Sequence, residues 1–290
     1  MVSAEVLVSA FLQGILVGGL YALIALGLSL VWGLVRFVNL AHVGFTVVSA
    51  YAVFVLNAKI GVDPSIAGAI LSPFFFLLGY LLFIVCNKIF ERGKGLLGSE
   101  LVFFFSLLII LEMIMFMLFG IDDKSIYTYY SMQSISIGFL NLPLRLIYPF
   151  ISCLCVVIAL HYFTTRTRLG IALRGVGLDE DVIAAVGCNP LRIKSLIFGL
   201  ALATASLAGG FLMATQPINP FSGRNFIGIA FAVSVIGGMG SVLGAFLGGC
   251  FIGVLESTIT VLFGAIWGVI ISFVAALVLL LIRPKGILGR

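Results

Sequence analysis

The sequence predicts an all-α, polytopic transmembrane helical bundle with about eight or nine membrane segments, some of them short or re-entrant. Two features of composition and one of pattern lead to this fold class. The chain of 290 residues is 62% hydrophobic, only 9% of it is charged, and long apolar runs recur from end to end. A typical soluble domain carries about 25% charged residues, so this composition cannot cover a water-facing surface. We therefore expect the whole chain, 1–290, to form a single membrane domain.

The apolar runs define the expected membrane segments. A helix needs about 20 residues to cross the roughly 30 Å hydrocarbon core of a bilayer. Runs of suitable length lie at 7–32, 37–56, 65–86, 99–119, 145–163, 195–215, 226–241, 243–262 and 265–283. The run 226–241 is short and glycine-broken, so it forms with the next run either two crossings or one re-entrant unit. The polar, tyrosine-rich segment 120–144 is expected to be either a solvated loop or an outward-facing docking surface.

Lysine and arginine predict the orientation, because cytoplasmic loops of membrane proteins carry an excess of both. If 166–194 is cytoplasmic and the sides alternate from there, twelve basic residues lie inside and four, at 59, 124, 145 and 224, lie outside. This bias predicts a multi-pass protein of the bacterial cytoplasmic (inner) membrane. Its N-terminus would be outside, and its C-terminus and the segment 164–194 would be cytoplasmic. Such scattered basic residues suit an anionic leaflet and do not indicate nucleic-acid binding.

The sequence contains no catalytic or metal-binding pattern. It has two histidines, His42 and His161, and it lacks HExxH, Walker A and nucleophile-elbow motifs. The five cysteines have no zinc-ligand spacing with a histidine, and are expected to be small apolar residues. We therefore expect no cofactor, no metal and no enzymatic activity. If nucleotide energy is used, another chain must bind the nucleotide.

The segment 166–194, RTRLGIALRGVGLDEDVIAAVGCNPLRIK, is a charged island in this apolar chain. Its apolar residues recur at helical spacing, which predicts two short amphipathic helices. Asp179 is expected to cap the second helix, Gly187 to end it, and Asn189 with Pro190 to start the next membrane helix. The apolar stripe is too small to form its own core. Either a groove in a partner protein or the lipid interface must cover it.

Two carboxylates, Glu112 and Glu256, fall inside expected membrane segments. An ionised carboxylate facing lipid costs about 2.5–3.5 kcal/mol, so both are expected to face the bundle interior. Each has two possible roles, as a contact for a substrate ammonium group or as a structural hydrogen bond to a neighbouring helix.

Glycines are concentrated in 237–253. Gly240, Gly244 and Gly248 recur every four residues, which predicts one helix face used for close packing. Gly237 and Gly238 are candidates for an unwound stretch that lines a path through the membrane.

Four stretches together resemble the LivH/LivM family, the membrane permeases of ABC importers for branched-chain amino acids, with a closer likeness to the LivH type. The family's cytoplasmic coupling loop is similar to RTRLGIALRGVGLDEDVIAAVGCNP, and its first membrane motif to YALIALGLSLVWGLVRFVNLAHVGF. Its glycine-rich run is similar to FAVSVIGGMGSVLGAFLGGCFIGVLES, and its ending to IRPKGILGR. Residues 65–160 match only in hydrophobic pattern. The chain departs from the family at Val43, where Gly is usual after the histidine, and at Gly175, where Ala is usual.

The resemblance implies a membrane-spanning permease subunit that forms the translocation path of an ATP-driven importer for branched-chain or other apolar amino acids. The implied partners are two cytoplasmic ATP-binding subunits, a second permease that is homologous or identical, an extracytoplasmic solute-binding protein and membrane lipid, with no nucleic acid. The stretch 216–220, QPINP, is expected to form an external turn within reach of the binding protein.

The resemblance also implies roles for particular residues of this chain. The residues expected to contact an ATPase groove are Arg168, Leu169, Gly170, Ala172, Leu173, Arg174, Asp179, Ala184, Val186 and Gly187. Leu169, Leu173 and Val186 would be the apolar anchors. The candidates for the translocation path are Asn39, which is also a possible helix cap, His42, Glu112, Gly237, Gly238, Gly240 and Glu256.

Other functions stay open from the sequence. The same machinery carrying urea, a short amide, a sugar or a nucleoside is the nearest alternative. A self-contained secondary transporter or channel would need no partner for 166–194. An intramembrane enzyme would need paired catalytic groups, which the sequence lacks.

Overall fold

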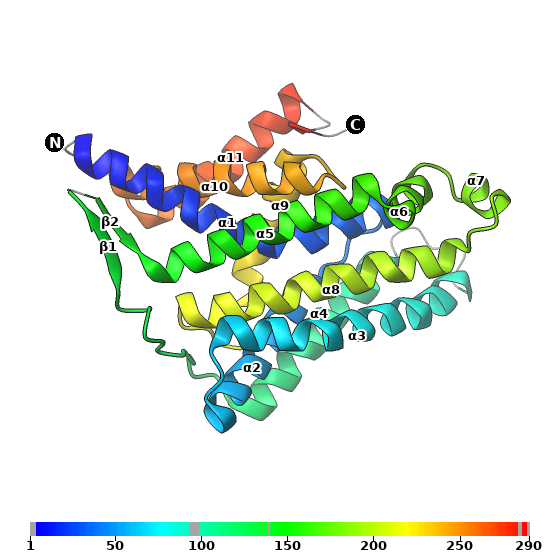
Figure 1. The fold of residues 1–290 in the computed structure, drawn as a ribbon, viewed down its shortest axis with the longest axis horizontal. Helices are drawn as coiled ribbons and strands as arrows, with labels where there is room; N and C mark the ends of the chain where they lie inside the picture. The colour runs from blue at the N-terminus through cyan, green and yellow to red at the C-terminus, as the bar shows by residue number, and fades with distance from the viewer. Residues whose placement is uncertain (1–3, 93–98, 139, 284–285, 289–290) are drawn as a thin grey trace.

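The computed structural model describes residues 4–92, 99–138, 140–283 and 286–288. Most helices lie along one long axis, with a two-stranded hairpin at one end and two short helices at the other (Figure 1). The helices are α1 Ala4–Val35, α2 Ala41–Ile60, α3 Pro64–Arg92, α4 Ser99–Phe119, α5 Leu144–Arg166, α6 Arg168–Leu178, α7 Glu180–Ala185, α8 Pro190–Thr215, α9 Gly223–Gly237, α10 Val242–Phe263 and α11 Ala265–Ile282. The strands are β1 Ser134–Ile137 and β2 Leu140–Pro143.

Within the described residues, eight helices are long and apolar enough to cross a membrane: α1, α2, α3, α4, α5, α8, α10 and α11. The 15 residues of α9 extend about 22 Å, which is less than the roughly 30 Å of a hydrocarbon core. The predicted all-α polytopic bundle with about eight or nine membrane segments is therefore confirmed. Three basic residues used for the orientation, Lys94, Lys285 and Arg290, lie outside the described residues.

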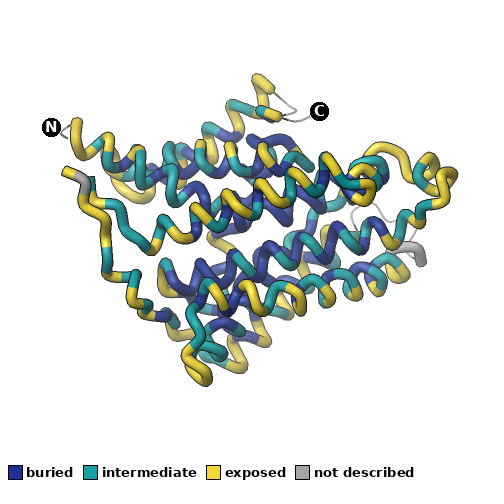
Figure 2. The backbone as a smooth tube through the Cα atoms, in the orientation of Figure 1, coloured by how far each residue is buried: buried dark blue, intermediate teal, exposed yellow. Residues whose placement is uncertain are grey.

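The core of the bundle is formed around α1 and α8, which are buried over most of their length (Figure 2). The helices α3, α4, α5, α10 and α11 show exposed residues along their outer faces. These exposed side chains are mostly large and apolar, which fits a surface that meets lipid rather than water.

The segment 120–144 contains the antiparallel hairpin β1–β2, which the sequence did not predict. Gln13 at the N-terminal part of α1 donates a hydrogen bond to the carbonyl oxygen of Asn141 at 3.2 Å. The hydroxyl of Tyr130 donates to Asp63 at 3.1 Å and ties the loop to the start of α3. Burial and the nearby charge of Asp63 raise the pKa of Tyr130 to about 12, so this donor keeps its proton at neutral pH.

Two sets of four helices, α1–α4 and α8–α11, make largely equivalent contacts and run in opposite directions. In the first half α1 is followed by the shorter α2, then α3 and α4, and in the second α8 is followed by the short α9, then α10 and α11. The most extensive packing joins the halves crosswise, α1 on α10 and α3 on α8. Because α1 and α8 run antiparallel (Figure 1), this is the arrangement of an inverted repeat, which is common among transporters.

Glycines permit the crosswise contacts. Gly14 and Gly18 of α1 lie against Gly253 and Gly249 of α10, and a Cβ atom at Gly18 would stand 2.5 Å from the Cα atom of Cys250. The contact of α3 with α8 also relies on glycines, namely Gly68, Gly79, Gly199 and Gly210. Such close backbone approach gives membrane helices their van der Waals contact, since lipid provides no hydrophobic drive between them.

The predicted glycine stripe is only partly present. Gly244 and Gly248 do pack closely on α9 near Gly237. Gly240, however, precedes α10, which begins at Val242, and its φ of 81° is not helical. Ser241 caps α10, so the helix begins after Gly240. The sequence spacing of four residues therefore spans a helix boundary and does not define a single helix face.

The helices α2 and α9, which occupy corresponding places in the two sets, both begin inside the bundle. After α1 ends at Val35, residues 36–40 return along it, and α2 starts where His42 Nε2 lies 3.0 Å from the carbonyl oxygen of Ile24. Ile24 is 11 residues, about 16 Å, from the end of α1, or roughly half of a membrane core. The expectation that Asn39 caps the helix is wrong, because the residue at the cap is Leu40 and no side chain caps α2.

The segment after α8 re-enters the bundle from the opposite direction. Residues 216–220 were expected to form an external turn, but Ile218 is fully buried and forms an antiparallel bridge with Lys124. Gly223 then starts α9 against Val43 and Val47 of α2. Irregular backbone is stable at membrane depth only under a cover of protein or water, which explains the burial. The starts of α2 and α9 are therefore neighbours.

Candidate functional site

The charged segment forms the two predicted short helices, α6 and α7, outside the eight membrane spans. Asp179 caps α7, accepting hydrogen bonds from the backbone N–H groups of Asp181 and Val182 at 2.9 and 3.3 Å. Gly187 follows α7 with a φ of 84°, and Asn189 caps α8. The three local predictions for Asp179, Gly187 and Asn189 are confirmed.

One face of α6 packs on the end of the bundle. Leu173 is 1% exposed, and Gly177 lies against Leu34 near the end of α1. Arg36, which follows α1 with a φ of 66°, donates from Nη2 to the carbonyl oxygen of Leu178 at 3.3 Å. Leu173, which the sequence offered as an anchor for a partner, therefore packs against this chain's own bundle.

Other parts of the surface of α6 and α7 are apolar and open. Five large apolar residues are more than half exposed: Leu169, Ile171, Leu178, Val182 and Val186. We call them the exposed stripe. Sequence reasoning named Leu169 and Val186 but missed Ile171 and Leu178, since the spacing does not tell which face of α6 turns towards the bundle. Of the other expected coupling residues, Arg168, Ala184 and Asp179 are exposed, Ala172 and Arg174 are partly buried, and Gly170 is buried.

The connection between α9 and α10 is an elbow of glycines. Gly238 and Gly240 have φ angles of 92° and 81°, which glycine adopts without strain. The N–H of Gly240 donates to the carbonyl oxygen of Ser29 at 3.0 Å, and Gly240 packs on Gly33. Residues 286–288 add backbone hydrogen bonds to the end of α9. The end of α1 thus touches α6 on one side and the glycine elbow on the other.

Glu112 faces the interior, as expected, and forms an ion pair with Arg224 in the first turn of α9. The Nε atom of Arg224 lies 3.0 and 3.1 Å from the two carboxylate oxygens, and Nη2 lies 2.6 Å from Oε2. The ring of Phe221 stands 5.2 Å from the guanidinium carbon. The sequence reasoning missed this site, because Glu112 and Arg224 are 112 residues apart and no local pattern joins them.

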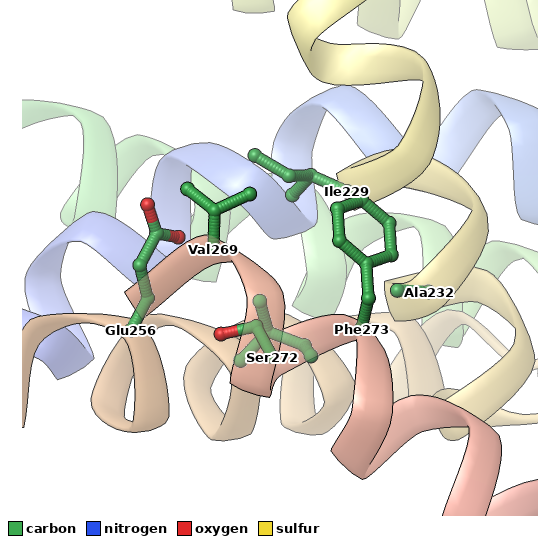
Figure 3. A pocket seen from close by; sticks show the side chains of 7 residues that line it. Ile229, Ala232, Glu256, Val269, Ser272 and Phe273 are labelled. Atoms are coloured by element: carbon green, nitrogen blue, oxygen red, sulfur yellow. The ribbon is translucent and has the colours of Figure 1, made fainter. Parts of the chain in front are cut away.

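Glu256 lies in a cleft between α9, α10 and α11 (Figure 3). It is partly exposed, and its carboxylate lies near the side chain of Tyr21. The rest of the cleft is lined by Ile229, Ala232, Ile252, Val269, Ser272 and Phe273. Its volume of about 10 Å³ has room for one water molecule, whereas small-molecule sites are typically about 300–1,000 Å³. In this conformation the cleft cannot enclose an amino acid.

Asn39 and His42 are fully buried at the start of α2. The Nδ1 atom of His42 and both amide atoms of Asn39 have no hydrogen-bond partner among the described atoms. Gly27 leaves the space that the imidazole ring occupies, since a Cβ atom there would overlap His42 Cε1. Buried polar atoms without partners are rare, and their concentration at a helix start inside the bundle makes this joint a candidate for binding water or ligand.

Comparison with known proteins agrees with these features. Residues 10–282 match the family described as "Branched-chain amino acid transport system / permease component". The chain belongs to this family. The permease is 31% identical over 300 residues to the high-affinity branched-chain amino acid transport system permease protein BraD of Pseudomonas aeruginosa, covering 96% of this chain and 94% of that protein. The predicted resemblance to the LivH/LivM family is confirmed.

Two more relatives cover the permease to a similar extent. LivH of Salmonella typhimurium is 28% identical to it over 298 residues, which is 96% of this chain and 94% of that protein. A probable LivH of Methanocaldococcus jannaschii is 27% identical over 289 residues, which is 95% of this chain and 90% of that protein. No solved structure matches the permease. In the described part of the chain no group of His, Cys, Asp and Glu side chains is arranged to hold a metal ion.

Proposed function

We propose that this permease is the membrane-spanning subunit of an ATP-driven importer for branched-chain or other apolar amino acids. It forms the translocation path, and separate ATPase subunits hydrolyse the nucleotide. The observation that carries the proposal is the unit α6–α7, which packs on the end of α1 with one face and leaves the exposed stripe open. The relatives BraD and LivH, both named as high-affinity branched-chain amino acid permeases, support the transport role and the substrate class.

The exposed stripe suits the groove of a cytoplasmic ATPase subunit. An amphipathic helix binds a groove through apolar residues at helical spacing, here Ile171 with Leu178 on α6 and Val182 with the C-cap residue Val186 on α7. The charged Arg168 and Asp179 stand beside the stripe at its rim. A movement of the ATPases would reach α1 through Gly177 and Leu34, and the glycine elbow through Gly33 and Gly240. In this proposal α6, α7 and the C-terminal residues 286–288 are cytoplasmic and the hairpin is extracytoplasmic.

The translocation path requires a second permease subunit, homologous or identical, in this proposal. The clefts at Glu256 and beside Glu112 are both too small to hold an amino acid, and the cleft at Glu256 opens at the surface of the chain. The path would be completed between two permeases, with Glu256, the joint of Asn39 and His42, and the glycine elbow as contributions from this chain. An extracytoplasmic solute-binding protein would deliver the substrate at the hairpin end.

Reconstitution of the complete importer in liposomes tests this function. We expect uptake of radiolabelled leucine that requires ATP and all subunits. Leu169→Ser with Val186→Ser removes two apolar residues of the exposed stripe, and should reduce both retention of the ATPase subunit and uptake. Ile158→Ser, at an apolar residue of α5 that is 60% exposed, is the matched control and should change neither. Leucine transport by the isolated permease without ATP would refute the proposal.

A further inference from the structure

We propose that the open edge of the Arg224 guanidinium binds the carboxylate of the transported amino acid, and that Glu112 and Phe221 hold the guanidinium in position. This inference rests on the proposed function and deepens it by naming the group that recognises the substrate. Arg224 is the binding residue, and Glu112 is a positioning residue.

The hydrogen bonds of Arg224 are only partly used. A guanidinium group has five N–H donors. Glu112 accepts from Nε and from one N–H of Nη2, and among the described residues no partner accepts from the other three. The side chain of Arg224 is 56% exposed, whereas that of Glu112 is 2% exposed. The paired edge therefore faces the bundle interior, and the unpaired edge faces outward.

The position of Arg224 requires a polar environment for that edge. Its neighbour Gly223 packs on Val43 and Val47, and α2 continues 13 residues, about 20 Å, beyond Val47 before it ends at Ile60. Arg224 thus lies within the thickness of the membrane, where exposure of a charged group to hydrocarbon is costly. A water-filled path or a carboxylate ligand would satisfy its free edge, whereas hydrocarbon would not. The same place is where the starts of α2 and α9 meet, at the boundary between the two halves.

The chemistry of the site fits a carboxylate. The planar guanidinium offers parallel N–H groups that match the two oxygens of a carboxylate. Glu112 fixes one edge of the plane and the ring of Phe221 lies over it, so little side-chain freedom remains to be lost on binding. Arg224 also stands in the first turn of α9, whose N-cap residue Ser222 makes no side-chain cap, and the local helix dipole favours an anion there.

Uptake by the complete importer at saturating, leucine-loaded binding protein tests the inference. Arg224→Gln should reduce the leucine uptake rate roughly 10- to 100-fold, the effect of losing charge-assisted hydrogen bonds. Arg224→Lys keeps the charge without the planar edge, and should give an intermediate rate. Lys88→Gln, which removes the charge of an exposed basic residue of α3, is the control and should retain the rate.

A charge-swapped variant separates recognition from structure. Glu112→Arg combined with Arg224→Glu keeps an ion pair between α4 and α9, but places a carboxylate where the substrate carboxylate would bind. We expect this variant to assemble with the ATPase subunits and to lose leucine uptake as Arg224→Gln does. If Arg224→Gln does not assemble, the swapped variant decides alone. Uptake at the unmodified rate by either variant would overturn the inference, whereas absence of ATP-dependent leucine uptake by the unmodified importer would refute the proposed function.

Discussion

Single glycine residues set the distance between the helices that carry the core. Gly18 stands so near α10 that a side chain there would collide with the backbone of Gly249 and Cys250. A backbone cannot yield as a flexible side chain does. The size of the residue at position 18, rather than its polarity, therefore determines whether α1 and α10 pack.

Gly18→Leu is expected to destabilise the folded permease. Overpacking of a close contact costs about 1–3 kcal/mol, and here two backbones must separate, which places the effect at the upper end. The midpoint of thermal unfolding in detergent measures the change. Ala159→Leu adds the same kind of side chain at an exposed position of α5 and is expected to leave the midpoint unchanged. Equal midpoints for the two variants would contradict this account of the contact.

Residue roles could be predicted from the sequence where they depend on near neighbours. Asp179 caps a helix through N–H groups two and three residues further on, so its role is visible locally. The ion pair of Glu112 with Arg224 depends on how α4 and α9 are placed in space, and no spacing in the chain reveals it. Asn39 has the side chain of a good cap, but the segment that carries it returns along α1, and its amide is buried without a partner.

At the scale of the element, α7 is a helix of six residues held by its cap. Asp179→Ala removes both side-chain hydrogen bonds to the first turn, at a cost of about 0.5–2 kcal/mol, whereas Asp179→Asn preserves a good cap. We expect the alanine variant to retain less ATPase subunit on copurification, and the asparagine variant to behave as the unmodified permease. If both variants lose the ATPase subunit equally, the charge of Asp179 matters rather than the cap.

The helices themselves were predictable, because a long apolar run is a local property of the chain. The points at which α2 and α9 begin were not. Residues 36–40 are apolar enough to read as the beginning of a membrane helix, yet they run without helical structure to the level of Ile24. Residues 216–220 have the composition of a surface turn, yet the backbone pairing of Ile218 with Lys124 draws them inside. Hydropathy reports how apolar a segment is, not how deep it starts.

At the scale of the whole molecule, the two ends of the bundle differ in what they present. The hairpin and the N-terminus lie at one end, and α6 and α7 lie at the other (Figure 1). In intact cells, a cysteine introduced as Tyr127→Cys in a cysteine-free background should react with an impermeant maleimide. Lys88→Cys, at an exposed residue of α3 that the basic-residue count places inside, should react only after the membrane is permeabilised. The reverse pattern would invert the orientation predicted from the basic residues.

The inverted halves have a consequence for the energetics of transport. Rotating such a molecule by half a turn about an axis in the membrane plane leaves a similar arrangement of helices, with α2 and α9 exchanging places. A form open to one side of the membrane and a form open to the other can then be built from the same kinds of contact. We expect two such forms to be close in free energy, so that a small preference of the nucleotide for one of them is enough to reverse the direction in which the permease faces.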